Sequence, residues 1–120
     1  MRGTVLVVDD DPGIRRCLGE FLEAEGFKVL SASNGRAALA VLEDELPDFL
    51  LVDVAMPVMD GEKLVEALDH YPDLARIPRI MMGERSGSDG VPTAVARVAS
   101  KPIDLGSLAS TMWEMLAAAA

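Results

Sequence analysis

The chain has little cysteine and histidine: Cys17 and His70 are the only residues of their kinds. One cysteine excludes an internal disulfide, and these two residues leave few ligands for a zinc site. The sequence also lacks a charged-then-apolar leader and any apolar run of about 18 residues, the length that a membrane-spanning helix needs. We therefore expect a cytoplasmic protein.

Basic residues are in the minority, with 11 Lys and Arg against 20 Asp and Glu, and the formal net charge is −9. Nucleic acids and anionic membranes attract Lys and Arg, so we expect no direct binding to either. Half of the 120 residues are hydrophobic. A chain of this size can bury roughly two-thirds of its unfolded surface, which predicts a single domain over residues 1–120.

Short apolar runs alternate with stretches whose apolar residues recur at helical spacing. Strands are predicted at 4–8, 28–32, 49–52, 79–82 and 97–100, and helices from Pro12 to the terminator Gly26, from Gly35 to before Pro47, over about 61–70, and from the N-cap Asp104 onward. This alternation predicts an α/β fold with a parallel sheet and helices on both faces. For five strands the common orders include the flavodoxin-like 2-1-3-4-5, in which the first and third strands are neighbours. Cys17 falls on the apolar stripe of the first helix, so we expect it to pack in the core.

An acid follows one of these apolar runs directly: residues 49–52 lead into Asp53. Pro57 prevents a central strand from continuing, and Asp60-Gly61 is a turn pair that can also begin a helix. Asp53 is therefore expected at the carboxyl end of a central strand, at the mouth of the sheet.

Acids also end the first predicted strand, as Asp9, Asp10 and Asp11. In the order 2-1-3-4-5 the carboxyl ends of strands one and three meet, so Asp9 and Asp10 are expected beside Asp53, with Lys101 pointing toward the same crevice. Carboxylates this close repel one another, and a divalent cation offsets that cost. Oxygen-only ligands suit Mg²⁺ better than a Ca²⁺ cage or a zinc site. Helix capping is the plainer explanation for the acids at 9–11, but it does not account for the acid on the neighbouring strand.

Over its whole length the chain resembles a two-component response-regulator receiver domain. The residues that carry the resemblance are Val7-Val8-Asp9-Asp10, Val52-Asp53, Met56-Pro57-Val58-Met59-Asp60-Gly61 and Lys101-Pro102. The resemblance implies a flavodoxin-like (βα)5 receiver fold and a phosphoacceptor function, in which a sensor histidine kinase or phosphotransfer protein donates a phosphoryl group to Asp53.

The resemblance also assigns roles around Asp53. It implies that Asp9, Asp10, Asp53 and the backbone carbonyl of Ala55 hold Mg²⁺, and that Lys101 contacts the phosphoryl oxygens. Such a domain signals through protein–protein contacts. It is not an enzyme, except that it can catalyse its own phosphorylation and dephosphorylation.

Two residues depart from the family pattern. Gly83 stands where receivers usually carry a Thr or Ser whose hydroxyl moves to the phosphoryl group, and Val98 stands where they commonly carry a Tyr or Phe that rotates inward. The stretch 83–93 also contains three glycines and Pro92 where a fourth helix is expected, and each glycine costs a helix interior about 1 kcal/mol. We therefore expect a short or irregular fourth helix, and phosphorylation that persists without the usual switch.

Three other interpretations of the acids were weighed. A haloacid-dehalogenase-like phosphatase also uses a strand-end Asp with Mg²⁺, but it needs a second acid two residues later, where this chain has Ala55. A dinucleotide-binding domain needs a glycine fingerprint after the first strand, where this chain has acids. A pseudo-receiver, which keeps the fold and binds a partner without a phosphorylation switch, stays open. Such a module has no evident reason to keep Asp9, Asp10, Asp53 and Lys101 together.

Overall fold

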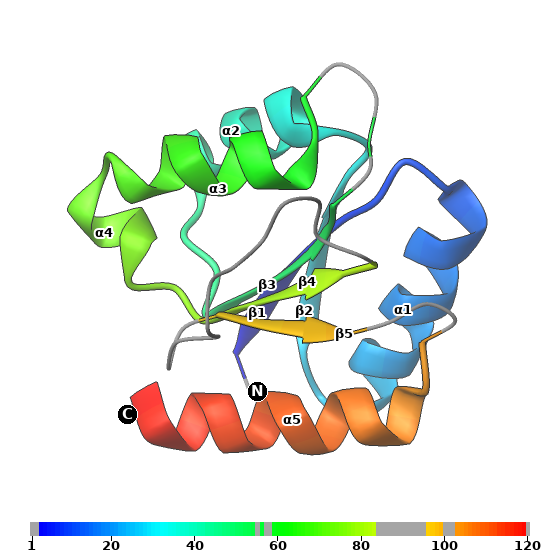
Figure 1. The fold of residues 1–120 in the computed structure, drawn as a ribbon. Helices are drawn as coiled ribbons and strands as arrows, with labels where there is room; N and C mark the ends of the chain where they lie inside the picture. The colour runs from blue at the N-terminus through cyan, green and yellow to red at the C-terminus, as the bar shows by residue number, and fades with distance from the viewer. Residues whose placement is uncertain (1–2, 55, 57–58, 84–95, 100–102, 120) are drawn as a thin grey trace.

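Five parallel strands form the centre of the computed structural model, which describes residues 3–54, 56, 59–83, 96–99 and 103–119. The strands are β1 (Thr4–Val8), β2 (Lys28–Ala32), β3 (Phe49–Asp53), β4 (Arg79–Met82) and β5 (Ala96–Ala99). They lie in the order β2-β1-β3-β4-β5 (Figure 1), which confirms the flavodoxin-like order. β5 begins and ends one residue earlier than predicted, and β3 includes Asp53.

The helices lie on both faces of this sheet. They are α1 (Pro12–Ala24), α2 (Gly35–Asp44), α3 (Gly61–Asp69), the single-turn α4 (Pro72–Ala75) and α5 (Leu105–Ala119). Helices α1 and α5 cover one face, and α2 and α3 cover the other (Figure 1). The sequence patterns did not predict α4. The fourth helix that we expected to be short or irregular falls on 84–95, which lies outside the described residues.

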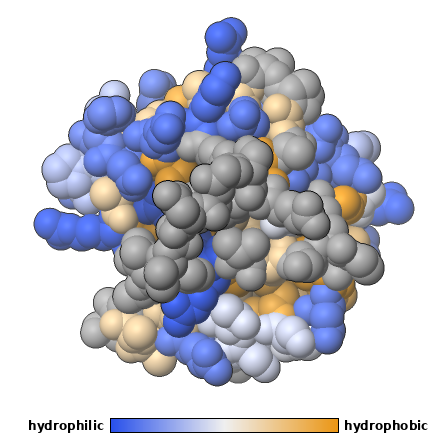
Figure 2. All heavy atoms as spheres, in the orientation of Figure 1, coloured by the Kyte–Doolittle hydropathy of each residue, from blue (hydrophilic) through white to orange (hydrophobic). Residues whose placement is uncertain are grey.

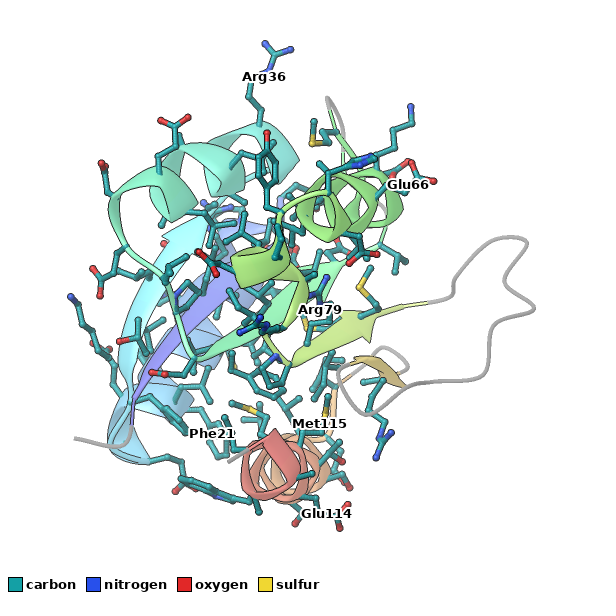
Figure 3. The ribbon with its side chains drawn as sticks, turned by 90° about the vertical axis from the view of Figure 1, so that its left-hand side faces the viewer. Phe21, Arg36, Glu66, Arg79, Glu114 and Met115 are labelled. Atoms are coloured by element: carbon teal, nitrogen blue, oxygen red, sulfur yellow. The ribbon has the colours of Figure 1, made fainter. Side chains whose placement is uncertain are left out.

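The core has two halves because successive strand residues point to opposite faces of the sheet. Leu6, Val8, Leu50, Val52 and Met81 pack with α2 and α3, whereas Val5, Val7, Phe49, Leu51, Ile80 and Met82 pack with α1 and α5. All five residues of β1 and of β3 are buried. Figure 3 shows the same division on the helices, with Met115 toward the sheet and Arg36, Glu66 and Glu114 pointing away from it.

Polar side chains begin the helices that leave the carboxyl edge of the sheet. Asp11 Oδ1 accepts a hydrogen bond from the Gly13 N–H at 2.8 Å, and Asn34 Oδ1 accepts one from Ala37 at 2.8 Å. The equivalent bonds run from Lys63 to Asp60 (2.9 Å) and from Gly106 to Asp104 (3.1 Å). Each such cap contributes about 1 kcal/mol and sets where the helix starts. The predicted caps at Asp104 and among the acids at 9–11 are confirmed.

The prediction for Cys17 is wrong, because its side chain is exposed. The buried stripe of α1 is centred on Leu18 and Leu22, with Ile14 and Phe21 partly buried beside them. Adjacent helix positions are about 100° apart, so Cys17 lies on the flank of the stripe that faces solvent. Helical spacing placed Cys17 beside the apolar stripe, and in the structure that side of α1 is exposed.

Polar residues dominate the visible surface. In Figure 2 hydrophilic side chains surround the face in view, and apolar areas show only between them. Among the described residues, Leu46 and Tyr71 are the large hydrophobic side chains that are exposed. No helix in this part of the chain is both long and apolar enough to cross a membrane.

A buried arginine, Arg79, begins β4 and lies between the sheet and α4 (Figure 3). Its Nε donates to the Ile77 carbonyl at 3.0 Å, and its Nη2 donates to the carbonyls of Leu74 (2.9 Å) and Ala75 (3.0 Å), which close the end of α4. Burial lowers the pKa of Arg79 below its usual value, and the Asp69 carboxylate partly restores it. Asp69 Oδ1 is 3.5 Å from Arg79 Nη1, and its side chain is largely exposed, so this ion pair contributes little. The hydrogen bonds to the carbonyls therefore supply most of the stabilisation of the buried guanidinium.

Arg79→Met should lower the free energy of unfolding by about 2–4 kcal/mol, because it removes the guanidinium hydrogen bonds to the carbonyls of Leu74, Ala75 and Ile77. Urea denaturation measures this. Arg76→Met, at an exposed position on the same segment, is the matched control and should change stability by less than about 0.5 kcal/mol. Equal stability of the two variants would contradict the role of Arg79.

Candidate functional site

Three carboxylates meet at the carboxyl edge of the sheet. One oxygen each from Asp9, Asp10 and Asp53 lies within 4.8 Å of the others. Asp9 follows β1 and Asp53 ends β3, and these strands are paired with Val8 opposite Val52. The predicted convergence is confirmed, and it occurs at the point where the strand order reverses, the usual ligand site of such sheets.

The three acids differ in their exposure. Asp9 is fully buried and Asp53 is 4% exposed, whereas Asp10 is exposed. Asp9 is held in place, because its Oδ1 accepts the Asp11 N–H at 2.9 Å and its carbonyl accepts a bond from Arg15 Nη1 at 2.7 Å. Two buried carboxylates thus lie beneath one that faces solvent. Such an oxygen-only donor set fits a hard divalent cation that keeps part of its water shell.

Gly61 brings α3 against the end of β3. Its N–H donates to the Val54 carbonyl at 3.1 Å, and a Cβ at this position would lie 2.8 Å from Val54 Cα and closer still to the Asp53 carbonyl oxygen. Real Cβ atoms do not approach backbone this closely. The sequence indicated Gly61 only as part of a turn pair; the reason for a glycine is this contact, which involves the backbone of Asp53.

Gly35 makes a second close approach on the same side of the sheet. Its N–H donates to the Met59 carbonyl at 3.2 Å, and a Cβ here would lie 2.7 Å from Met59 Cγ. Helix α2 therefore begins in direct contact with the segment that follows the acid cluster. This contact was not predicted, because nothing in the local sequence pairs Gly35 with Met59.

Gly83, which follows β4, lies near the carboxylate of Asp53. A Cβ on Gly83 would lie 3.9 Å from Asp53 Oδ1 and 3.2 Å from Val54 Cγ2. The Gly83 N–H donates to the Ala99 carbonyl at 2.7 Å, and its φ is +101°. Side chains other than glycine rarely adopt this φ. The backbone conformation thus favours glycine at this position. A Thr or Ser could not be placed here without strain in the backbone.

Three other predicted site residues, or their side chains, are not among those that the structure describes. Ala55 and Lys101 lie outside the described residues. Val98 is in β5, opposite Met81 of β4, but its side chain is not among those described. Their assigned roles stay predictions.

The fold and the acid cluster together define a CheY-like α/β domain. The chain belongs to the response regulator receiver domain family, whose sequence profile matches residues 5–112. In structure it is similar to the signal receiver domain of a signal transduction histidine kinase from Syntrophus aciditrophicus, with a TM-score of 0.84, 31% identity and coverage of 97% of this chain and 91% of that one.

Relatives in sequence include longer proteins. An uncharacterised 14.6 kDa protein from Leptolyngbya boryana is 46% identical over 78 residues, which are 65% of this chain and 60% of that protein. The response regulator PleD of Caulobacter vibrioides is 35% identical over 108 residues, which are 87% of this chain and 24% of PleD. The chain therefore spans only part of these relatives' length.

Gly61→Ala should destabilise the protein by about 1–3 kcal/mol, because the added methyl overlaps the backbone at Asp53 and Val54. Thermal or urea unfolding measures the loss. Gly19→Ala is the matched control: its Cβ would sit 3.8 Å from Val29 Cγ1 within α1 and should be neutral or stabilising by up to about 1 kcal/mol. An equal effect of both changes would show that the close approach at Gly61 is unimportant.

Gly83→Thr should destabilise the protein by about 1–3 kcal/mol, because φ at this position strains any L side chain. Gly83→Ala should cost a similar amount, since the strain arises from Cβ and not from the hydroxyl. Urea denaturation of both variants tests this. A threonine variant as stable as the parent protein would show that the backbone does not select glycine.

Proposed function

We propose that this receiver domain accepts a phosphoryl group on Asp53, with Mg²⁺, from the phosphohistidine of a sensor histidine kinase or phosphotransfer protein. The cluster of Asp9, Asp10 and Asp53 is the observation that carries the proposal. Capping does not explain it, because the N-cap of α1 is Asp11. The structural likeness to receiver domains of histidine kinases supports a partner of this kind.

The chemistry follows from the position of Asp53. Its carboxylate oxygen attacks the donor's phosphorus, the phosphorus–nitrogen bond breaks with its electron pair passing to the imidazole, and an acyl phosphate forms. Asp9, Asp10, Asp53 and the Ala55 carbonyl would hold Mg²⁺, which when bound neutralises charge on the phosphoryl oxygens. Lys101 would contact the same oxygens. Asp9, whose carboxylate is fixed by the Asp11 N–H, would hold its oxygen in position for the metal and would not itself be phosphorylated.

This proposal describes a signalling domain and not an enzyme with a separate substrate. The chain would at most catalyse the gain and loss of its own phosphoryl group. Its output would pass through protein–protein contacts. The position of Gly83 beside Asp53, with a backbone that favours glycine, supports an output that does not use a hydroxyl at this position.

The second candidate is a pseudo-receiver, an interaction module that works without phosphorylation. Gly83 favours this reading, because no side chain at this position can report a phosphoryl group. The acid cluster argues against it, since two buried carboxylates are costly to keep without a use. Labelling of Asp53 separates the two functions.

Incubation with acetyl phosphate and Mg²⁺ should add the mass of one phosphoryl group to the protein, and Asp53→Asn should abolish this addition. Asp60→Asn is the matched control, since asparagine caps α3 as well as aspartate does and the change is chemically identical. Intact-protein mass spectrometry reads both variants. Chelation of Mg²⁺ should suppress labelling of the parent chain. Labelling of Asp53→Asn at the parent level would exclude Asp53 as the acceptor, and no labelling of the parent would favour the pseudo-receiver.

A further inference from the structure

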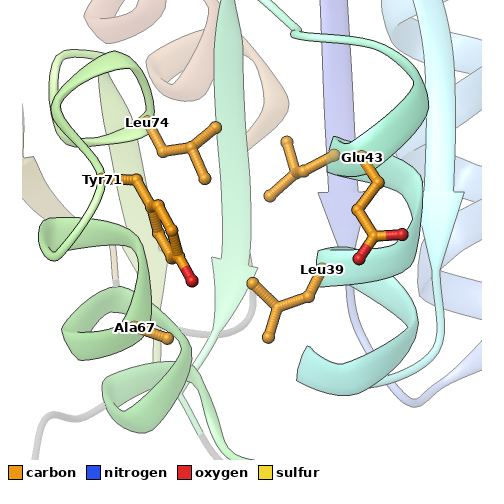
Figure 4. A pocket seen from close by; sticks show the side chains of 6 residues that line it. Leu39, Glu43, Ala67, Tyr71 and Leu74 are labelled. Atoms are coloured by element: carbon orange, nitrogen blue, oxygen red, sulfur yellow. The ribbon is translucent and has the colours of Figure 1, made fainter.

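An apolar groove lies between α2 and the segment from the end of α3 to α4, and its lining includes none of the three acids (Figure 4). Its volume is about 380 Å³, and its walls are Leu39, Leu42 and Glu43 of α2 and Ala67, Tyr71 and Leu74 on the other side. This volume is at the small end of ligand cavities, which span roughly 300–1,000 Å³. The groove has room for a few side chains and not for a large cofactor.

The groove combines apolar walls with one acidic group. Figure 4 shows Leu39 and Glu43 on α2 facing Tyr71 and Leu74 across the opening. Tyr71 is 59% exposed, which is unusual for a large ring in a chain whose other apolar side chains are mostly buried. The exposed Glu43 carboxylate makes no ion pair or hydrogen bond within the described part of the chain. The groove therefore offers a partner an exposed apolar surface and a carboxylate that has no ion-pair partner among the described residues.

The negative charge around the groove favours a partner with positive charge. Exposed acids on α2, α3 and α4 outnumber exposed bases among the described residues: Glu43, Asp44, Glu66, Asp69 and Asp73 against Arg36, Lys63 and Arg76. The chain as a whole carries a net charge of −9. A second copy would bring the same charge and be repelled, and so would an anionic membrane or nucleic acid. A basic partner is attracted.

We propose that this groove binds a short amphipathic, basic segment of a partner protein. One or two of its apolar side chains enter between Leu39 and Leu74, and a Lys or Arg lies opposite Glu43. A helix that lays its apolar face into a groove is a common mode of peptide recognition. This binding is separate from the proposed phosphorylation and does not depend on it.

The groove is in structural contact with the phosphoacceptor edge. Helix α2, which forms one wall, begins at Gly35 against the Met59 carbonyl, and α3, which leads to the other wall, begins at Gly61 against the Val54 carbonyl. A segment that spreads or closes the two helices therefore acts on elements joined to the strand end that carries Asp53.

The probe is an acetylated and amidated peptide of sequence Lys-Leu-Leu-Lys-Lys-Leu-Leu-Lys, titrated into the ¹⁵N-labelled chain with saturating Mg²⁺ and no phosphodonor. The expected result is saturable movement of the amide signals of Leu39, Glu43, Ala67, Tyr71 and Leu74. A peptide with alanine in place of leucine should bind at least tenfold more weakly, because the apolar contact is lost. A peptide with glutamate in place of lysine should likewise lose affinity.

Two variants place the peptide in the groove. Ala67→Trp fills the space between the helices and should abolish saturable binding, while circular dichroism confirms that the variant is folded. Glu43→Gln should weaken binding about two- to fivefold, the range of an exposed ion pair. Glu66→Gln removes the same charge from an exposed position that does not line the groove, and should leave binding unchanged.

Several outcomes would overturn the proposal. These are equal binding of the leucine and alanine peptides, signal changes centred on Asp9 and Asp53 instead of the groove, and equal loss of affinity in Glu43→Gln and Glu66→Gln. Unchanged binding to a folded Ala67→Trp variant would have the same consequence. Because no phosphodonor is present, failure here leaves the assignment of Asp53 intact, and failure of phosphorylation leaves the groove intact.

Discussion

The site depends on the burial of two carboxylates at the carboxyl ends of the paired strands β1 and β3. Asp9 is fully buried and Asp53 nearly so, and an oxygen of the exposed Asp10 lies within 4.8 Å of an oxygen of each. Removal of like charges from water costs several kcal/mol unless hydrogen bonds or a cation compensate. The Asp11 N–H supplies part of that compensation to Asp9. The fully buried strands β1 and β3 hold the acids in place, at the point where the strand order of the parallel sheet reverses.

Glycine is used around this edge to bring backbone close to backbone. Gly61 abuts the end of β3, and Gly35 abuts Met59, so the first turns of α3 and α2 are in contact with the segment beside the acids. At Gly83 the backbone conformation itself favours glycine. The same close contacts join the acid cluster to the two helices that form the groove. The edge that carries the acids and the proposed docking surface are therefore parts of one packed unit.

Local patterns predicted the elements well because each depends on neighbouring residues. The apolar runs placed β1, β2 and β4 at their observed bounds, and capping residues placed the starts of α1 and α5. The patterns failed where the outcome depends on distant parts of the chain. Cys17 lies beside the apolar stripe of α1, yet the helix packs on the sheet through Leu18 and Leu22 and leaves Cys17 exposed. The failure at Arg79 is local instead: this residue begins a strand, and the unpredicted turn at α4 brings the carbonyls of Leu74 and Ala75 onto its side chain.

The sequence alone determined the fold class and the identity of the three acids, because alternating periodicity dictates a parallel α/β sheet and the acids follow its strands directly. Only the tertiary structure decided how these residues are used. It buried Asp9 and Asp53 while leaving Asp10 exposed, favoured glycine at positions 61 and 83, and opened a groove at Tyr71. These properties depend on the distances between segments far apart in the chain, and such distances arise only when the helices pack on the sheet.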